Sequence, residues 1–176
     1  MRILLLLSAI VLSLGSGVEN TQLDEKDTNS MIKANYLYNF AKLVGWPEKK
    51  SKGNFVIGIL GDPSLYQQMI KRYSDKSIGN QPIEIVQLLG TDRLTEMHML
   101  FVSRTKSGET EAVVKETMKA NTMVVTESDN GLSHGSVINI VVVDNRLKFD
   151  INETNAGSRE LVIANTLKSL ANNLIK

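Results

Sequence analysis

Short apolar runs separated by helix-like segments constrain the fold of this chain more than any other feature. The runs NFVIGILG (54–61), MHMLFVS (97–103) and TMVVTE (122–127) are apolar and rich in β-branched or bulky side chains. Runs of this kind are typical of strands that are buried on both faces of a sheet. QPIEIVQLL (81–89) alternates apolar with polar residues and predicts a further strand. The middle of the chain is therefore expected to form a sheet.

Helices are expected between these strands. Asp62 and Pro63 supply an N-cap and a first-turn proline for a helix that runs to about Tyr73. Residues 107–121 form an amphipathic pattern that begins with a serine and acidic residues, which favours a second helix. Strands that alternate with helices predict parallel pairing, with helices on both faces of the sheet.

The last third of the chain departs from this alternation. Residues 136–152 divide at Asp144-Asn145, a pair that favours a hairpin turn between two strands. From about Glu153 to Ile175 we expect a closing helix. Its apolar stripe would consist of Ile163, Leu167, Leu170 and Leu174.

One stretch, KANYLYNFAKLVGWP (33–47), is unusually aromatic for a chain with only 5% aromatic residues. Its spacing predicts a helix from Met31, which ends before Pro47 because the residue preceding a proline is pushed out of the helical region. The apolar face would carry Ile32, Tyr36, Phe40, Leu43 and Val44. Trp46-Pro47 would turn the chain into the first strand. Tyr38 lies about 200° from Tyr36 around such a helix, so we expect it to contact something outside the domain.

The N-terminus has the pattern of a secretory signal peptide over residues 1–17. Arg2 precedes an apolar run of about thirteen residues that ends in small ones, as such peptides require. The run is short for a membrane-spanning helix, which needs about 20 apolar residues, although an uncleaved anchor is the alternative. The absence of cysteine at the exit excludes a bacterial lipoprotein. We expect a cleaved, exported protein with a flexible lead-in at residues 18–30.

The sequence therefore predicts one α/β domain over residues 31–176. We expect three layers, with a mixed, mostly parallel sheet of about six strands flanked by helices and a late antiparallel hairpin. Lysine and arginine total 20 against 19 acidic residues, so the chain lacks the basic surplus of a nucleic-acid-binding protein. Because it has no cysteine, disulfides, thiol catalysis and cysteine-based metal sites are excluded.

Residues with catalytic potential are few. His98 lies inside an apolar strand and is expected to be packed, whereas His134 lies in a loop and cannot form a metal site alone. Gly61-Asp62 follows a strand directly, where backbone amides can hold an anion, although helix capping explains these residues equally well. We expect no cofactor, no metal and no catalytic residue.

Four stretches together resemble the YfiR-like family of exported proteins over about residues 31–175. They are KANYLYNFAKLVGWP, VIGILGDP, MHMLFVS and VINIVVVDNRLKFDINETNAGSRELVIANTLKSLA. The resemblance implies a non-enzymatic periplasmic regulator that binds and restrains the sensor part of an inner-membrane diguanylate cyclase. Release of that contact would raise cyclic di-GMP and promote biofilm formation, and members tend to be dimeric. The chain departs from the family at Met97, where members often have cysteine, and at His134-Gly135 in place of Gly-Gly.

Three functions are weighed against one another. The first is the regulator, whose membrane partner is a diguanylate cyclase or a sensor kinase. The second is a small-ligand binding protein, with its site near Gly61-Asp62 and residues 129–135. An enzyme is the third and would require Asp62, Asp129 and His134 to meet in one deep cleft. The candidate partner or ligand contacts are Tyr38, Gly61, Asp62, His134, Phe149 and Asn152.

Overall fold

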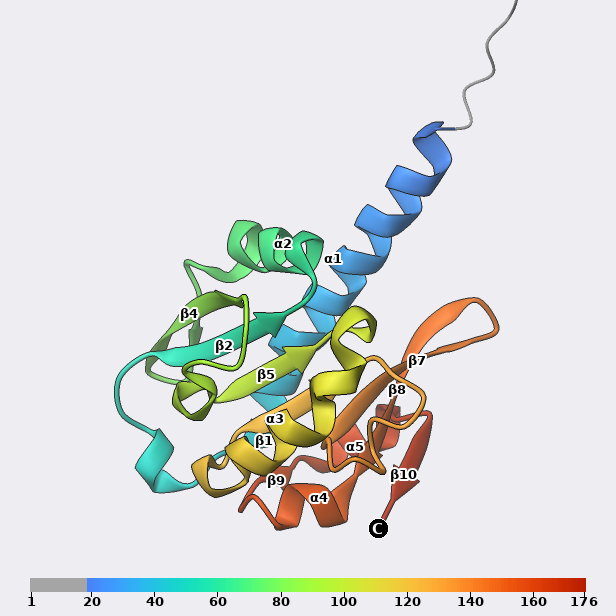
Figure 1. Cartoon of the computed structure of the whole chain (residues 1–176). Helices are drawn as coiled ribbons and strands as arrows, with labels where there is room; N and C mark the ends of the chain where they lie inside the picture. The colour runs from blue at the N-terminus through green and yellow to red at the C-terminus, as the bar shows by residue number, and fades with distance from the viewer. Residues whose placement is uncertain (1–18) are drawn as a thin grey trace, which may run out of the picture.

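An eight-stranded sheet forms the centre of the computed structural model, which describes the backbone of residues 19–176 and the side chains of residues 25–176. Its strands follow the order β10-β8-β7-β6-β5-β2-β4-β3 (Figure 1). In chain order they are β2 (Phe55–Leu60), β3 (Ser77–Ile78), β4 (Gln81–Leu88), β5 (Met99–Val102), β6 (Met123–Thr126), β7 (Ile138–Val143), β8 (Arg146–Asn152) and β10 (Asn173–Ile175). A separate two-stranded sheet pairs β1 (Val44–Gly45) with β9 (Val162–Ile163).

The five central strands are parallel, as the alternating pattern predicts. β2 pairs with both β4 and β5, and β5, β6 and β7 follow in turn. β8 runs antiparallel to β7, β3 runs antiparallel to β4, and β10 lies parallel to β8. The chain reverses its direction of travel across the sheet between β2 and β5. Such a reversal is a topological switch point, where ligands of open α/β sheets bind beyond the carboxyl ends of the strands.

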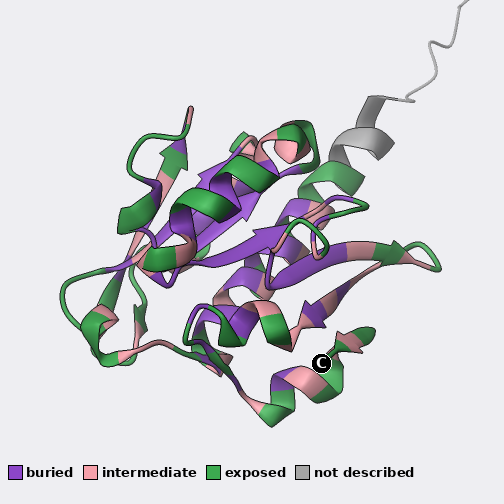
Figure 2. Ribbon diagram, turned by 60° about the horizontal axis from the view of Figure 1, so that its bottom comes forward, coloured by how far each residue is buried: buried purple, intermediate pink, exposed green. Residues whose placement is uncertain are grey.

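Helices cover both faces of the sheet, and the buried strands lie between them (Figure 2). α1 and α2 pack on one face, where their apolar residues join Phe55, Ile57 and Phe101, while α3 packs on the other against Leu100 and Val124. The α-helices are α1 (Glu19–Leu43), α2 (Pro63–Tyr73), α3 (Thr110–Thr117), α4 (Glu153–Gly157) and α5 (Asn165–Leu170). The 3-10 helices are η1 (Glu48–Lys50), η2 (Leu94–Glu96), η3 (Arg104–Glu109) and η4 (Met118–Ala120). The predicted three-layer, mostly parallel α/β domain is confirmed.

α1 is longer than predicted. The structure continues it back to Glu19, through most of the segment 18–30 that we expected to be a flexible lead-in, and it projects from the domain (Figure 1). Residues 25–28 are exposed, and the buried face begins only at Ser30. A polar helix without an apolar stripe leaves no periodic signal in the sequence, although Glu, Gln and Lys are good helix formers. The signal peptide predicted for residues 1–17 lies outside the described residues.

The closing helix predicted for residues 153–175 is wrong. The segment instead contains α4, β9, α5 and β10, and Glu160 adopts a positive φ of 57° that ends any helical continuity. Leu170, which the apolar stripe placed in the core, is 68% exposed. Pairing of β9 with β1 and of β10 with β8 replaces the helical hydrogen bonds, so distant strands override the local periodicity.

The hairpin between β7 and β8 matches its prediction closely. Asp144 and Asn145 both have positive φ, 50° and 56°, as a two-residue type I′ turn requires. The flanking residues Val143 and Arg146 pair directly. Among the described helices, none combines the length and the apolar character that crossing a membrane demands.

Candidate functional site

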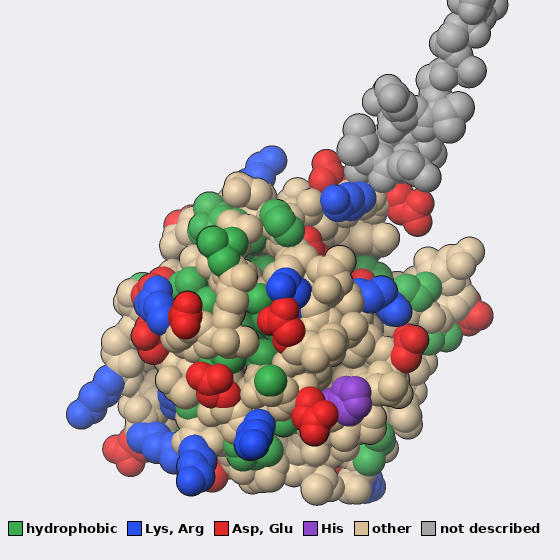
Figure 3. All heavy atoms as spheres, in the orientation of Figure 1, with side chains coloured by type: hydrophobic (Ala, Val, Ile, Leu, Met, Phe, Trp, Pro, Cys, Tyr) green, Lys and Arg blue, Asp and Glu red, His purple; other side chains and the backbone are tan. Residues whose placement is uncertain are grey.

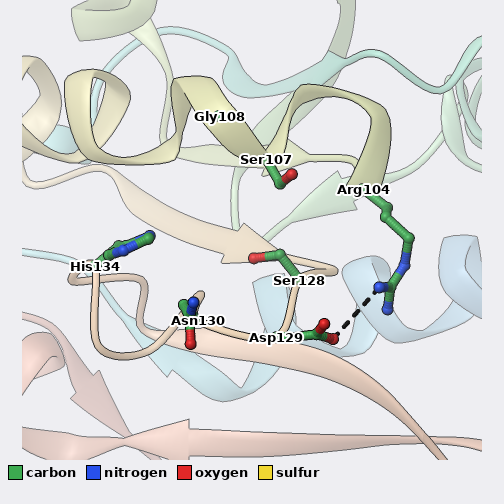
Figure 4. Close-up of a pocket in the computed structure, with 7 residues that line it drawn as sticks. All are labelled: Arg104, Ser107, Gly108, Ser128, Asp129, Asn130 and His134. Atoms are coloured by element: carbon green, nitrogen blue, oxygen red, sulfur yellow. Dashed lines mark hydrogen bonds and ion pairs between the residues drawn. The ribbon is translucent and has the colours of Figure 1, made fainter.

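The carboxyl ends of three parallel strands meet at one edge of the sheet. Gly61-Asp62 follows β2, Ser103 follows β5, and Glu127 follows β6. Two neighbouring pockets lie along this edge, and both include Arg104. The switch-point pocket, about 250 Å³, is lined by Lys26, Lys33, Gly61, Asp62, Pro63, Ser64, Ser103, Arg104, Thr105 and Glu127. The loop pocket, about 290 Å³, is lined by Arg104, Ser107, Gly108, Ser128, Asp129, Asn130 and His134 (Figure 4).

Lys33 of α1 joins two carboxylates in the switch-point pocket. Its Nζ lies 2.9 Å from Asp62 Oδ2 and 2.9 Å from Glu127 Oε2, and its side chain is only 10% exposed. Nζ also lies 5.7 Å from the centre of the Phe101 ring. Burial lowers the pKa of Lys33, but the hydrogen bonds and charges of Glu127 and Asp62 outweigh it, so the pKa rises above its ordinary value. Lys33 is therefore charged and ties α1 to the ends of β2 and β6.

Asp62 also caps α2, as the sequence predicts. Its Oδ1 accepts a hydrogen bond from the backbone N–H of Leu65 at 2.9 Å, and Pro63 occupies the first helical position. The preceding Gly61 has a φ of 84°, and a Cβ at that position would lie 2.4 Å from Ser103 Oγ. Glycine is thus required there, because the end of β2 runs directly against the end of β5. Thr105 Oγ1 joins the two ends by donating to the Gly61 carbonyl at 3.0 Å.

The loop pocket lies between η3 and the segment that follows β6. The Ser128 hydroxyl and the His134 imidazole point toward one another across it, while Arg104 reaches out to Asp129 at its edge (Figure 4). The Arg104 Nη1 to Asp129 Oδ1 distance is 3.3 Å, and both side chains are well exposed. The pocket is therefore polar, with one guanidinium and several uncharged hydrogen-bonding groups around it.

The loop that carries Ser128 to His134 is anchored by buried polar groups. Asn139 Oδ1 accepts hydrogen bonds from Thr126 Oγ1 at 2.8 Å and from the Ser128 backbone N–H at 3.1 Å. Asn155 Nδ2 donates to the Leu132 and Ser136 carbonyls at 2.9 and 2.8 Å. These bonds hold both ends of the loop against β7 and α4, so the pocket is formed by fixed backbone.

Three of the sequence-predicted contacts line these pockets, and three do not. Gly61 and Asp62 line the switch-point pocket, and His134 lines the loop pocket. Tyr38 is half-buried, and its ring stacks on Tyr73 of α2 with ring centres 4.3 Å apart, so it does not stand free of the domain as expected. The remaining two are structural: Phe149 is 5% exposed within the core, and Asn152 caps α4.

The residues that an enzyme would need are not gathered in one deep cleft. Asp62 lines one pocket and Asp129 and His134 the other. Within residues 25–176, no three His, Asp or Glu side chains are grouped to hold a metal ion. His98 is buried as predicted: its Nε2 lies 2.8 Å from the Lys50 carbonyl, and burial lowers its pKa.

Sequence reasoning missed Lys33, Glu127, Arg104 and Ser128. A signal existed for Lys33, which lies four residues before the buried Leu37 and therefore on the same helical face. Glu127 and Ser128 come directly after a buried strand, where the switch-point rule places ligand contacts. Nothing in the sequence distinguishes Arg104 from other exposed arginines, because its place depends on how β5 and β6 align.

Comparison with known proteins bears on the family and the fold of the chain. A sequence model of the YfiR/HmsC-like family matches residues 30–172, and that family supports a general role in regulating cyclic di-GMP signalling. No curated protein matches the chain by sequence.

Two solved structures share its fold. A conserved domain protein from Vibrio cholerae O1 biovar El Tor aligns with a TM-score of 0.57 and 9% identity, over 82% of this chain and 60% of that one. The ABC domain of Streptococcus pneumoniae in complex with L-Trp aligns with a TM-score of 0.50 and 10% identity, over 68% of this chain and 55% of that one. The chain thus spans less than two thirds of either protein.

Proposed function

The chain belongs to the YfiR/HmsC-like family, whose model matches most of its length, and we propose that it is an exported regulator of a membrane-bound diguanylate cyclase. In this proposal the protein binds the periplasmic sensor part of the cyclase and restrains it. Loss of the contact raises cyclic di-GMP and promotes biofilm formation. The observation that carries the proposal is the family match over residues 30–172.

The surface of the last elements supports a docking role. A partner surface needs apolar area and shape rather than a catalytic set. Val162 on β9 and Leu170 on α5 are 71% and 68% exposed, and Ile175 on β10 is also exposed. These three elements gather at one end of the molecule (Figure 1). Isolated apolar side chains on a surface are common, but three in one short segment favour a contact site.

Export and dimerisation are part of the same proposal. The signal-like residues 1–17 would direct the chain to the periplasm, where a partner in the inner membrane is within reach. Fractionation of cells that produce the whole chain tests the location, with a cytoplasmic marker enzyme as the control. Light scattering on the purified mature protein tests the expected homodimer.

The decisive experiment measures cyclic di-GMP in the native host. Deletion of this protein should raise cyclic di-GMP and biofilm mass, and expression of the wild-type chain from a plasmid should reverse both. A chain that lacks residues 1–17 should fail to do so, because it stays in the cytoplasm. Unchanged cyclic di-GMP in the deletion strain would overturn the proposal. If the deletion does raise cyclic di-GMP, photo-crosslinking from Leu170 should capture the partner, either a diguanylate cyclase or a sensor kinase.

A further inference from the structure

The loop pocket contains polar side chains that have no partner within the described part of the chain. Ser128 is only 9% exposed, yet its hydroxyl makes no hydrogen bond there, and it points into the pocket (Figure 4). The side chains of Ser107, Asn130 and His134 also line the pocket without a hydrogen bond to residues 25–176. These groups open onto the pocket rather than into the protein interior, so an entering ligand can bond to them without breaking a hydrogen bond within residues 25–176. This set of groups is therefore suited to a bound molecule.

The pocket offers an oxyanion one cationic contact, although its lining also holds the carboxylate of Asp129. Arg104 is its single cationic side chain, and a guanidinium presents a planar fork of donors that matches carboxylate and phosphate groups. Asp129 holds Arg104 through an exposed contact of 3.3 Å, and such surface pairs are weak. Glu127 and Asp62, which line the neighbouring pocket, are both bonded to Lys33 there. An incoming oxyanion can therefore take the place of Asp129 on Arg104.

The pocket is also preformed. Hydrogen bonds from Thr126, Ser128 and Asn155 fix both ends of its loop. At Gly131 an added Cβ would lie 2.0 Å from Thr126 Oγ1, so the loop backbone lies directly against β6. A site on fixed backbone loses little entropy when it binds.

We propose that the loop pocket binds a small molecule through a carboxylate or phosphate group, with Arg104 and Ser128 as the principal contacts and Ser107, Asn130 and His134 around it. The volume of about 290 Å³ suits a compact metabolite rather than a nucleotide or peptide. This binding activity goes beyond the regulatory docking proposed above and does not depend on it.

Thermal unfolding of the purified mature protein tests the site directly. Sodium phosphate and sodium acetate are titrated separately against sodium chloride at equal ionic strength. Binding to the folded state must raise the Tm, so one or both oxyanions should raise it by several degrees more than chloride. Because phosphate also stabilises proteins without binding to them, only a response that Arg104→Gln abolishes counts as binding. Such a response to phosphate alone assigns a phosphate ligand, and one to acetate alone assigns a carboxylate. If neither raises the Tm more than chloride does, the proposal is wrong.

Substitutions then locate the binding. Arg104→Gln and Ser128→Ala should each weaken oxyanion binding about tenfold or more, as expected for a charge-assisted hydrogen bond. Ser128→Ala should leave the Tm of the free protein unchanged, because the hydroxyl has no hydrogen bond to lose. Arg93→Gln is the matched control, since Arg93 also lies in an exposed ion pair, with Glu96, outside the pocket. Equal binding by Arg104→Gln and Arg93→Gln would contradict the assignment.

Discussion

Among the residues of the candidate site, Lys33 is the one whose replacement should lower the free energy of unfolding most. Its replacement by methionine leaves Asp62 and Glu127 facing each other in a largely buried place without their shared cation. Breaking a buried ion pair from one side typically costs about 3 kcal/mol. We therefore expect Lys33→Met to lower the free energy of unfolding by about that amount in urea denaturation. Lys71→Met, at an exposed position of α2, should change it by less than about 0.5 kcal/mol.

The same ion pairs predict that the stability of the folded protein depends on pH. The pKa of Lys33 is raised in the folded protein above its ordinary 10.5, so the folded state holds the proton more tightly than the unfolded chain. The contribution of Lys33 is then fully present below the unfolded pKa and is lost as pH rises through the folded pKa. The stability difference between wild type and Lys33→Met should therefore be constant near neutral pH and shrink in strongly alkaline solution. A constant difference throughout would contradict the assigned charge.

Arg159 is a buried cation that, unlike Lys33, has no carboxylate partner within residues 25–176. It is fully buried, its Nε has no hydrogen-bond partner among the described residues, and its nearest contacts are Met118 Sδ and the Gly135 carbonyl. Burial lowers its pKa. An apolar side chain of similar volume in its place would remove the cost of taking this charge out of water. Arg159→Met should thus leave the Tm unchanged or raise it in calorimetry. A large fall would show that the contacts of Arg159 with Met118 and Gly135 outweigh the cost of burying its charge.

These residues show why side-chain roles were harder to predict than local structure. Asp62 was recognised as a cap because capping depends on neighbours in the sequence. The triad around Lys33 depends on residues 29 and 94 positions away along the chain, which no local pattern reports. The family motif makes Phe149 a candidate partner contact, but its place on β8 puts it against Tyr36 and Phe40 in the core.

At the scale of elements, the turn between β7 and β8 offers a sharp test. Both turn residues have positive φ, which glycine tolerates and β-branched residues do not. Asn145→Gly should leave the protein as stable or raise its unfolding free energy by up to about 0.5 kcal/mol. Asn145→Val should lower it by about 1–2 kcal/mol, because strain at such a position costs that much. Equal stabilities for the two variants in parallel urea titrations would mean that the turn is not of this type.

Elements with strong local signals were predicted well, and those that depend on distant pairing were not. β2, β4, β5, β6 and the β7–β8 hairpin all lie within the runs that predicted them. The helix predicted for the C-terminal segment is wrong because its apolar residues at helical spacing also suit short strands. β1, β3, β9 and β10 have only two or three residues each, too few for any periodicity to register.

At the scale of the whole molecule, the sheet order decides where function is possible. The sequence predicted parallel strands with a late hairpin, but the reversal between β2 and β5 comes from pairing alone. That reversal brings Asp62 and Ser103 to one edge beside Glu127, where they line the switch-point pocket. The charged side chains visible in the space-filling view are mixed in sign over that face (Figure 3), in keeping with nearly balanced charge. Binding there must depend on local groups rather than on a broad electrostatic field.

The last prediction concerns the proposed docking surface of Val162, Leu170 and Ile175, which lies on elements other than those around the pockets. Val162 and Leu170 are exposed apolar side chains of β9 and α5, and neither lines a pocket described above. Leu170→Glu should lower the unfolding free energy by less than about 0.5 kcal/mol, as surface substitutions usually do. In the deletion strain, however, it should fail to lower cyclic di-GMP, because a charge within an apolar contact commonly costs more than about 1 kcal/mol of binding. Val162→Glu should act in the same direction.

Leu89→Glu is the matched control for this test, since Leu89 is a still more exposed leucine that follows β4 on a different part of the chain. It should restrain cyclic di-GMP as the wild type does. Periplasmic levels of each variant, measured by immunoblot, separate lost docking from lost protein. If Leu170→Glu restrains the cyclase fully while Leu89→Glu does not, the docking surface lies near the end of β4. The apolar residues of β9, α5 and β10 would then have no part in it.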